Sequence, residues 1–331
     1  GTGAFMAVGA YAAYNFQVRI DGMPLIASLL LGGVCATGVG VLFGIPSLRI
    51  KGLYLAVATL AAQFFVDWAC LRLKWVTNDS SSGSVSVAGL NVLIDPTLCD
   101  FAGPLGRFGA PRRVPAPLAP EDLPPIDVVL ISHNHYDHAE SETLKFFAAR
   151  ENPPVFVPLR VAPLMKNFGF AEVHELDWWQ EIDLGKFKIA CLPAKHFSGR
   201  SATDRNETLW ASFMISFHEP QRHVYFAGDT AYSPHFTEIA QEYPDIHLTL
   251  MPIGAYLPRW FMREVHVSPD EAIRAYEDLS ARKMLGIHWG TYDLADEDWD
   301  QPRREAMAAA KARGLDLQGI KITGVGEDFV F

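Results

Sequence analysis

Apolar residues are distributed unevenly along the chain. No residue between Asp21 and Arg49 is charged, and Pro24 and Pro46 bracket 21 residues of apolar character, LIASLLLGGVCATGVGVLFGI. About 20 apolar residues suffice for a helix to cross a bilayer, and glycines favour close helix packing there. We predict a membrane-type helix over about 25–45, with a buried soluble helix or a signal peptide as alternatives. A second apolar run predicts a helix over about 52–73, and the uncharged residues 1–18 would make a third.

A polar tract, TNDSSSGS at 77–84, has the composition of a linker and ends this apolar part. After it, short apolar runs alternate with amphipathic stretches, which indicates an α/β domain. The start of one helix is well marked, because Ser268, Pro269 and Glu271 form a capping-box pattern. The predicted strands are 90–94, 127–132, 187–192, 210–217, 223–227, 247–252 and 284–288. The predicted helices are 141–149, 161–168, 234–242, 269–279 and 301–312.

Charge divides the chain at the same place. The 331 residues carry a net charge of −10, but residues 1–86 hold five basic and three acidic residues, so that the remainder carries −12. All eleven histidines lie in that acidic remainder. We therefore expect two domains, 1–86 and 87–331. The acidic balance argues against nucleic acid as a partner, and four cysteines without a CxxC pair argue against a disulfide framework.

Metal-ligating residue types cluster directly after the predicted strand 127–132. Three histidines and one aspartate occur within six residues, in the motif HNHYDH at 133–138. Imidazole and carboxylate are the usual ligands of catalytic Zn²⁺, although Mn²⁺ or Fe accepts similar ones. The spacing of His133 and His135 can aim both at one cation, and Asp137 and His138 can reach a second. Three further candidates follow predicted strands or glycine-rich turns, where functional side chains of α/β sheets project: His196, Asp229 and His288.

The motif, with these later residues, resembles the metallo-β-lactamase fold hydrolases. The segments VLIDPTLCDFAGPLGRFGAPRRVP, LPAKHFSGR, YFAGDTAYSPHF and MPIGAYLPRWFMREVHVSPDEA are similar to those of the N-acyl-phosphatidylethanolamine-hydrolysing phospholipases D. The resemblance implies an αββα sandwich with two metal ions. One zinc would be held by His133, His135 and His196, and the other by Asp137, His138 and His288, with Asp229 bridging them. Asp95 matches the aspartate that supports the ligands. His266 matches a position near the substrate, with a surface histidine before a helix as the alternative. We assign catalytic roles to Asp137 and His266.

A second resemblance covers residues 1–86. The segments GAFMAVGAYAAY and GIPSLRIKGLYLAVATLAAQFF resemble the permease subunit of branched-chain amino acid ABC transporters, of which this would be a fragment. The opening strand that the hydrolases place before residues 90–94 has no counterpart, since permease-like residues 77–86 stand there. We therefore expect the first strand to be missing and a sheet edge to be unpaired.

These resemblances imply a zinc-dependent phosphodiesterase that cleaves N-acyl-phosphatidylethanolamine-like lipids with a metal-bridging hydroxide. A lactonase or sugar-phosphate hydrolase of the same superfamily is one alternative, and a transporter component with a passenger domain is another. The expected partners are a phosphodiester substrate and the membrane, with the hydrolase domain on the cytoplasmic side of an inner membrane, while a homodimer is left open. Four aromatic residues are candidates either for an acyl groove or for ordinary core packing: Trp178, Trp179, Trp260 and Phe261.

Overall fold

The structure is a computed structural model that describes residues 8–9, 12–13, 15–16, 20, 23–47, 85–87, 90–104, 108–324 and 326–327, with the backbone alone at 42–47 and 85–87. The chain forms two compact units, 1–81 and 82–331. In the first unit, helix α2 (Leu25–Ser47) forms where the apolar run predicts it. The helix predicted over 52–73 lies outside the described residues.

Membrane-type character is not supported for helix α2. Within the described residues, no helix has the combination of length and apolarity that a bilayer crossing requires. The uncharged run over 25–45 correctly predicts a helix, but an apolar helix can equally be buried against protein. The predicted helix at this position is therefore confirmed, but its prediction as a membrane-spanning helix is not.

Two large sheets and one short hairpin are described in the second unit. The smaller has the order β1-β2-β5-β6-β7, and its strands are β1 (Val85–Val87), β2 (Leu90–Ile94), β5 (Val128–Leu130), β6 (Val155–Pro158) and β7 (Val173–Leu176). The larger has the order β14-β13-β12-β11-β10-β9-β8. Its strands are β8 (Glu181–Asp183), β9 (Phe187–Leu192), β10 (Ser212–Phe217), β11 (Arg222–Phe226), β12 (Ile246–Pro252), β13 (Met284–Ile287) and β14 (Ile320–Lys321). A separate hairpin joins β3 (Phe101–Ala102) to β4 (Ala110–Pro111).

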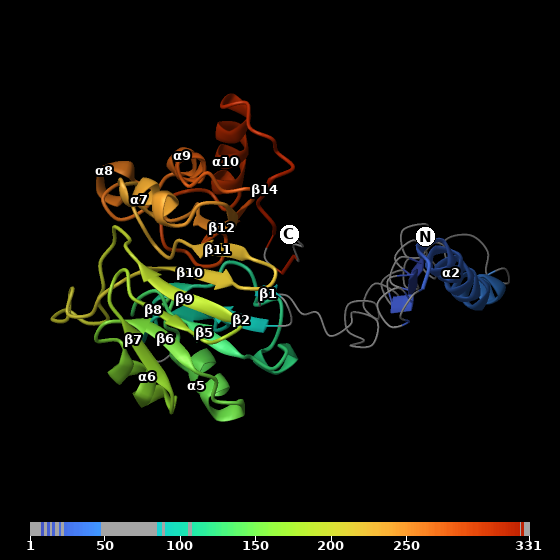
Figure 1. The fold of residues 1–331 in the computed structure, drawn as a ribbon, viewed down its shortest axis with the longest axis horizontal. Coiled ribbons are helices and arrows are strands. Elements are labelled where there is room, and N and C mark those ends of the chain that lie inside the picture. Colours follow the sequence, from blue (N-terminus) through green and yellow to red (C-terminus); the bar gives the residue numbers. More distant parts are fainter. Residues whose placement is uncertain are drawn as a thin grey trace. The chain divides into compact units, whose positions relative to one another are not determined.

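Helices cover the outer face of each sheet, so the unit is the αββα sandwich that the resemblance implies (Figure 1). The smaller sheet carries α5 (Ser141–Arg150) and α6 (Ala162–Phe168). The larger sheet carries α7 (His235–Glu242), α9 (Pro269–Asp278) and α10 (Gln301–Ala312). Two short helices, η2 (Pro120–Asp122) and α8 (Arg259–Met262), lie in connecting segments.

Three apolar layers hold the sandwich together. In β5, Val128 and Leu130 point into the layer between the sheets, whereas Val129, and Ile131 directly after the strand, pack beneath α5 and α6. The third layer lies between the larger sheet and its helices, and includes Met214 of β10. Strands buried on both faces are continuously apolar rather than alternating, which explains the apolar runs in the sequence.

The first strand of the smaller sheet is present, contrary to expectation. β1 pairs antiparallel with β2, with Val85 opposite Val92 and Val87 opposite Leu90. Backbone pairing depends on extended geometry more than on particular side chains, so a segment without the expected motif can still fill the edge position. The prediction that this edge of β2 is unpaired was therefore wrong.

The other elements predicted for the second unit are confirmed. The seven predicted strands and five helices all form, with ends displaced by no more than two residues. At α9 the Ser268 hydroxyl accepts from the Glu271 backbone N–H, and the Glu271 side chain accepts from the Ser268 N–H, as the capping box predicts. Sequence patterns missed β6, β7 and β8, which are short and either follow prolines or are largely polar.

Candidate metal centre

The predicted ligands lie just beyond the carboxyl ends of strands from both sheets. Asp95 follows β2, and the loop 133–138 comes after β5, in the smaller sheet. His196, Asp229 and His288 follow β9, β11 and β13 of the larger sheet. Ligand sites of α/β proteins form at this edge because the loops there converge from different strands. The two sheets together thus assemble one site.

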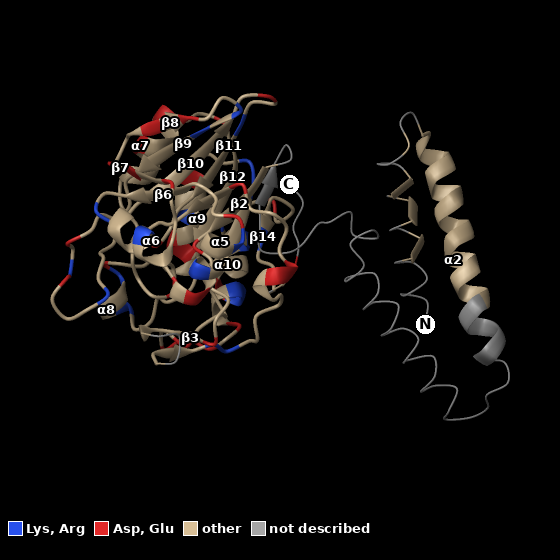
Figure 2. Ribbon diagram, turned by 90° about the horizontal axis from the view of Figure 1, so that it is seen from below, with Lys and Arg blue, Asp and Glu red and all other residues tan. Residues whose placement is uncertain are grey.

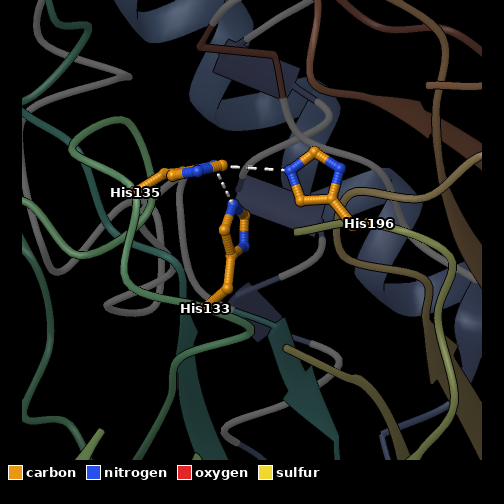
Figure 3. A group of neighbouring side chains, drawn as sticks. All are labelled: His133, His135 and His196. Carbon is orange, nitrogen blue, oxygen red and sulfur yellow. Dashed lines mark hydrogen bonds between the residues drawn. The ribbon is translucent and has the colours of Figure 1, made fainter. Parts of the chain in front are cut away.

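Three histidines form the first donor set (Figure 3). His133 Nε2 lies 2.7 Å from His135 Nδ1, and His196 Nε2 lies 3.3 Å from the same atom. His133 and His196 are 1% and 8% exposed. Three ring nitrogens that face one another in a buried position fit a shared cation, which can accept all three lone pairs.

Two carboxylates and two histidines form the second set. The ligand atoms of Asp137, His138, Asp229 and His288 all lie within 4.8 Å of one another. His138 Nε2 is 3.1 Å from Asp229 Oδ2 and 3.1 Å from His288 Nε2. Asp229 Oδ2 also lies 3.7 Å from His196 Nε2 of the first set. Asp229 therefore stands between the two sets.

Hydrogen bonds fix which ring nitrogen His138 and His196 present to the donor sets. His138 donates from Nδ1 to Asp95 Oδ2 (2.6 Å), and His196 donates from Nδ1 to the Val265 carbonyl (2.9 Å). Both acceptors can only accept, so each ring carries a proton on Nδ1 and turns Nε2 toward the donor sets. This use of the second ring nitrogen is typical of metal-binding histidines. The donor types and their orientation therefore fit divalent cations.

Charge differs between the two sets. Burial lowers the pKa of His133 well below its ordinary value, and lowers the pKa of His135 and of His196 to about 4. These rings are neutral at pH 7, which is the metal-binding form. In the second set burial also lowers the pKa of His138 and His288, but the facing carboxylates, Asp229 first, outweigh it and raise both above the ordinary value.

The structure places His266 beside the second set. Its Nδ1 lies 3.8 Å from Asp229 Oδ2 and has no hydrogen-bond partner among the described residues. Burial lowers its pKa to about 3, so the ring is neutral at pH 7. A buried neutral imidazole with a free nitrogen next to the ligands is suited to contact a bound substrate.

The four aromatic groove candidates separate into two kinds. Trp178 packs against the core between the sheets, and its indole donates to the Trp210 carbonyl at 2.7 Å. Trp178 therefore takes part in ordinary core packing, which was the alternative to an acyl groove. Trp179 is 45% exposed, Trp260 80% and Phe261 63%. These three side chains lie on the surface rather than in a shared interior groove.

Sequence reasoning did not single out Arg200. This half-buried guanidinium donates to the carbonyls of Asn134 and Ala139, both at 2.8 Å, and lies 3.9 Å from the centre of the Tyr136 ring. It thereby holds the backbone of the loop that carries four ligands. Its position four residues after His196 could have pointed to a role near the site. A basic residue in a loop is usually exposed to solvent, however, so sequence alone offers no reason to prefer that role.

Comparisons with known proteins agree with this geometry. Residues 90–289 match the Beta-lactamase superfamily domain, and residues 1–98 match the permease component of branched-chain amino acid transport systems. An isothiocyanate hydrolase from Delia radicum gut bacteria has the same fold, with a TM-score of 0.59 at 18% identity over 75% of this chain and 95% of that one.

Two relatives are more similar in sequence. An uncharacterized protein of Mycobacterium tuberculosis is 36% identical over 250 residues, which are 74% of this chain and 65% of that protein. N-acyl-phosphatidylethanolamine-hydrolyzing phospholipase D 1 of Caenorhabditis elegans is 35% identical over 272 residues, 78% of this chain and 75% of that protein. This chain thus spans about two thirds to three quarters of the length of these relatives. It belongs to the β-lactamase superfamily, and within it is related to the N-acyl-phosphatidylethanolamine-hydrolysing phospholipases D.

Proposed function

We propose that this chain is a metal-dependent phosphodiesterase that hydrolyses N-acyl-phosphatidylethanolamine-like lipids, with two divalent cations, most simply Zn²⁺. The observation that carries the proposal is the pair of adjacent donor sets with Asp229 between them. Two neighbouring cations suit phosphoryl transfer because they stabilise both the attacking and the leaving oxygen. The 35% identity to the nematode phospholipase D supports the lipid as substrate.

The roles of the residues follow from their contacts. His133, His135 and His196 would hold one cation, and Asp137, His138 and His288 the other, with Asp229 shared. When bound, the cations would supply an activated water and neutralise charge on the phosphoryl oxygens. Asp95 keeps the His138 proton on Nδ1. His266, neutral and with Nδ1 free, would contact the substrate or the leaving group.

The 331-residue chain loaded with Zn²⁺ tests the proposal. Asp137→Asn removes one negative charge from the second donor set and should abolish release of N-acylethanolamine from N-acyl-phosphatidylethanolamine. Asp127→Asn is a matched control, because Asp127 is an exposed carboxylate that accepts from the Asn91 N–H at 2.7 Å, outside the donor sets. Hydrolysis by the Asp137 variant at the rate of the parent protein would refute the assigned site.

A wider substrate panel separates the alternatives within the superfamily. The same donor sets would serve a lactone or a sugar phosphate. Cleavage of either substrate by the parent protein, without cleavage of the phospholipid, would move the assignment to that class while keeping the metal site.

A transport component is the second candidate function. It is favoured by the match of residues 1–98 to the permease family, and it would make residues 82–331 a passenger. Copurification with an ATP-binding transporter subunit would support it. Localisation at a membrane and assembly into a homodimer are likewise proposals for this chain.

A further inference from the structure

The short helix α8 exposes two large aromatic side chains next to each other. Trp260 is 80% exposed, the highest value for a large apolar residue in the described part of the chain, and Phe261 is 63% exposed. Their ring centroids lie 5.7 Å apart in an edge-to-face arrangement. Such a pair forms one continuous apolar surface, for which the described residues provide no covering element.

This aromatic pair belongs to the segment that supports the metal centre. Four residues beyond Phe261, the Val265 carbonyl accepts the hydrogen bond from His196 Nδ1. The next residue is His266, whose Nδ1 lies 3.8 Å from Asp229 Oδ2. The Val267 N–H then donates to the Thr230 carbonyl at 2.8 Å. A surface bound to Trp260 and Phe261 would therefore lie beside the candidate site.

Arg259 holds this segment in place. Its guanidinium donates to the His266 carbonyl at 2.9 Å and to Glu271 Oε2 at 2.8 Å, so it ties α8 to the start of α9. The Arg263 N–H donates to the Arg259 carbonyl at 3.1 Å. The exposed rings are thus presented by a braced segment rather than by a free loop.

The net charge of the side chains near the aromatic pair is positive, although the chain as a whole carries a net charge of −10. Arg263 and Lys195 both pair with the single carboxylate of Glu264, at 3.4 and 2.9 Å. One carboxylate neutralises one of them, so one positive charge remains beside the aromatic pair. Figure 2 shows basic positions at α8. N-acylation removes the amine charge of phosphatidylethanolamine, so the proposed substrate displays only the negative phosphate.

We propose that Trp260, Phe261 and Arg263 form a docking surface for an anionic phospholipid bilayer, which brings the metal centre to its lipid substrate. This rests on the proposed function, since a lipid substrate is what gives docking a purpose. Aromatic rings favour the boundary between water and hydrocarbon, and neighbouring cationic side chains favour anionic headgroups. The combination distinguishes this surface from an acyl groove, which would bury the rings inside the protein.

Fluorescence quenching tests the docking directly. The 331-residue chain is mixed with vesicles of phosphatidylglycerol and phosphatidylcholine whose acyl chains carry bromine, which quenches tryptophans that enter the bilayer. The difference between the parent protein and Trp260→Phe isolates the Trp260 signal from the other tryptophans, including those of residues 1–81. We expect this signal to be quenched in anionic vesicles. An unquenched Trp260 signal would overturn the proposal.

Variants separate the contributions. Trp260→Ala with Phe261→Ala should lower vesicle partitioning by about tenfold or more, the effect of removing two aromatic side chains from an apolar contact. Leu184→Ala with Leu317→Ala is the control, because these side chains are each 38% exposed and precede β9 and β14, at the amino ends of the strands rather than at the carboxyl ends where the candidate site lies. Arg263→Glu should reduce binding to anionic vesicles more than to neutral ones. Equal losses in the two double variants would contradict a specific docking surface.

Two further outcomes are decisive. In the absence of vesicles, the Trp260 emission should not shift with protein concentration. Such a shift would identify a second copy of the chain as the occupant of the aromatic surface and would overturn the proposal that a bilayer binds there. The catalytically impaired Asp137→Asn protein should still show quenching. If the parent protein shows quenching but no lipid hydrolysis, the proposed function is overturned and the docking surface is retained. If it shows hydrolysis but no quenching, the docking surface is overturned and the proposed function is retained.

Discussion

Replacing Asp95 by Asn tests how the site controls its histidines. Both Asp95 oxygens accept hydrogen bonds: Oδ1 from the Ser132 backbone N–H at 2.7 Å, and Oδ2 from His138 Nδ1 at 2.6 Å and from the Ser132 hydroxyl. An Asn side chain offers one oxygen and one NH₂ group. Its backbone suits the site, because Asp95 has φ of 41° and Asn tolerates this region as well as Asp does.

Either orientation of the amide leaves a mismatch. If the oxygen faces His138, the NH₂ group faces the Ser132 N–H and two donors oppose each other. If the NH₂ group faces His138, the ring proton moves to Nε2, the atom that the cation needs. The first case leaves a buried donor without an acceptor, which costs about 1–3 kcal/mol. The second imposes a competing tautomer, and disruption of such supporting partners lowers metal affinity by about 10–100-fold.

Chelator competition measures the effect. Metal-depleted parent protein, Asp95→Asn and the exposed-carboxylate control Asp127→Asn are each titrated with Zn²⁺ against a chromophoric chelator at pH 7.5. We expect a dissociation constant about 10–100-fold weaker for Asp95→Asn alone. An Asp95→Asn protein that is folded by circular dichroism and binds Zn²⁺ as tightly as the parent would refute the argument that Asp95 sets the His138 tautomer.

The remaining predictions concern stability. Phe147→Ala empties a fully buried position of α5 and should lower the free energy of unfolding in urea by about 3–5 kcal/mol; a loss below that of an exposed-site alanine would contradict the packing. Ser268→Ala removes the cap of α9 and should cost about 1 kcal/mol, detectable as a lower thermal midpoint. Burial lowers the pKa of His235 to about 4, so below its unfolded pKa near 6.5 the unfolded state binds a proton that the folded state excludes. Stability should therefore fall between about pH 6.5 and 4, by at most about 1.4 kcal/mol per pH unit, and His235→Gln should remove that part of the slope.

Local sequence patterns predicted the parts of the site that lie close together in the chain. The loop 133–138 contains so many ligand-type residues that it indicates a metal site without any other part of the sequence. The apolar run before the loop predicted the strand that carries it. His196, Asp229 and His288 were found only because the loop drew attention to them, since each is a single polar residue after a strand. Their convergence depends on strand order, in which β9 and β11 flank β10, and no local pattern encodes strand order.

Support for the ligands was harder to predict than the ligands. Arg200 acts through backbone carbonyls, which carry no sequence signature. The filled edge beside β2 was missed for a related reason, because β1 pairs through its backbone. In residues 1–81 the reverse holds: an uncharged apolar run predicted helix α2 correctly, but hydropathy alone does not decide between burial in lipid and burial against protein.

The seam between the two sheets determines how the donor sets are spaced. The smaller sheet supplies the loop 133–138 and the larger sheet supplies Asp229, so their separation depends on contacts across that seam. The Ala211 N–H donates to the Ser132 carbonyl at 2.9 Å, directly before His133. Gly228, directly before Asp229, has φ of 60°, and a Cβ there would lie 2.8 Å from the Ala211 carbonyl oxygen and 3.0 Å from Ser132 Cβ. Glycine at 228 therefore lets the two strand ends approach closely enough for ligands from both sheets to share one site.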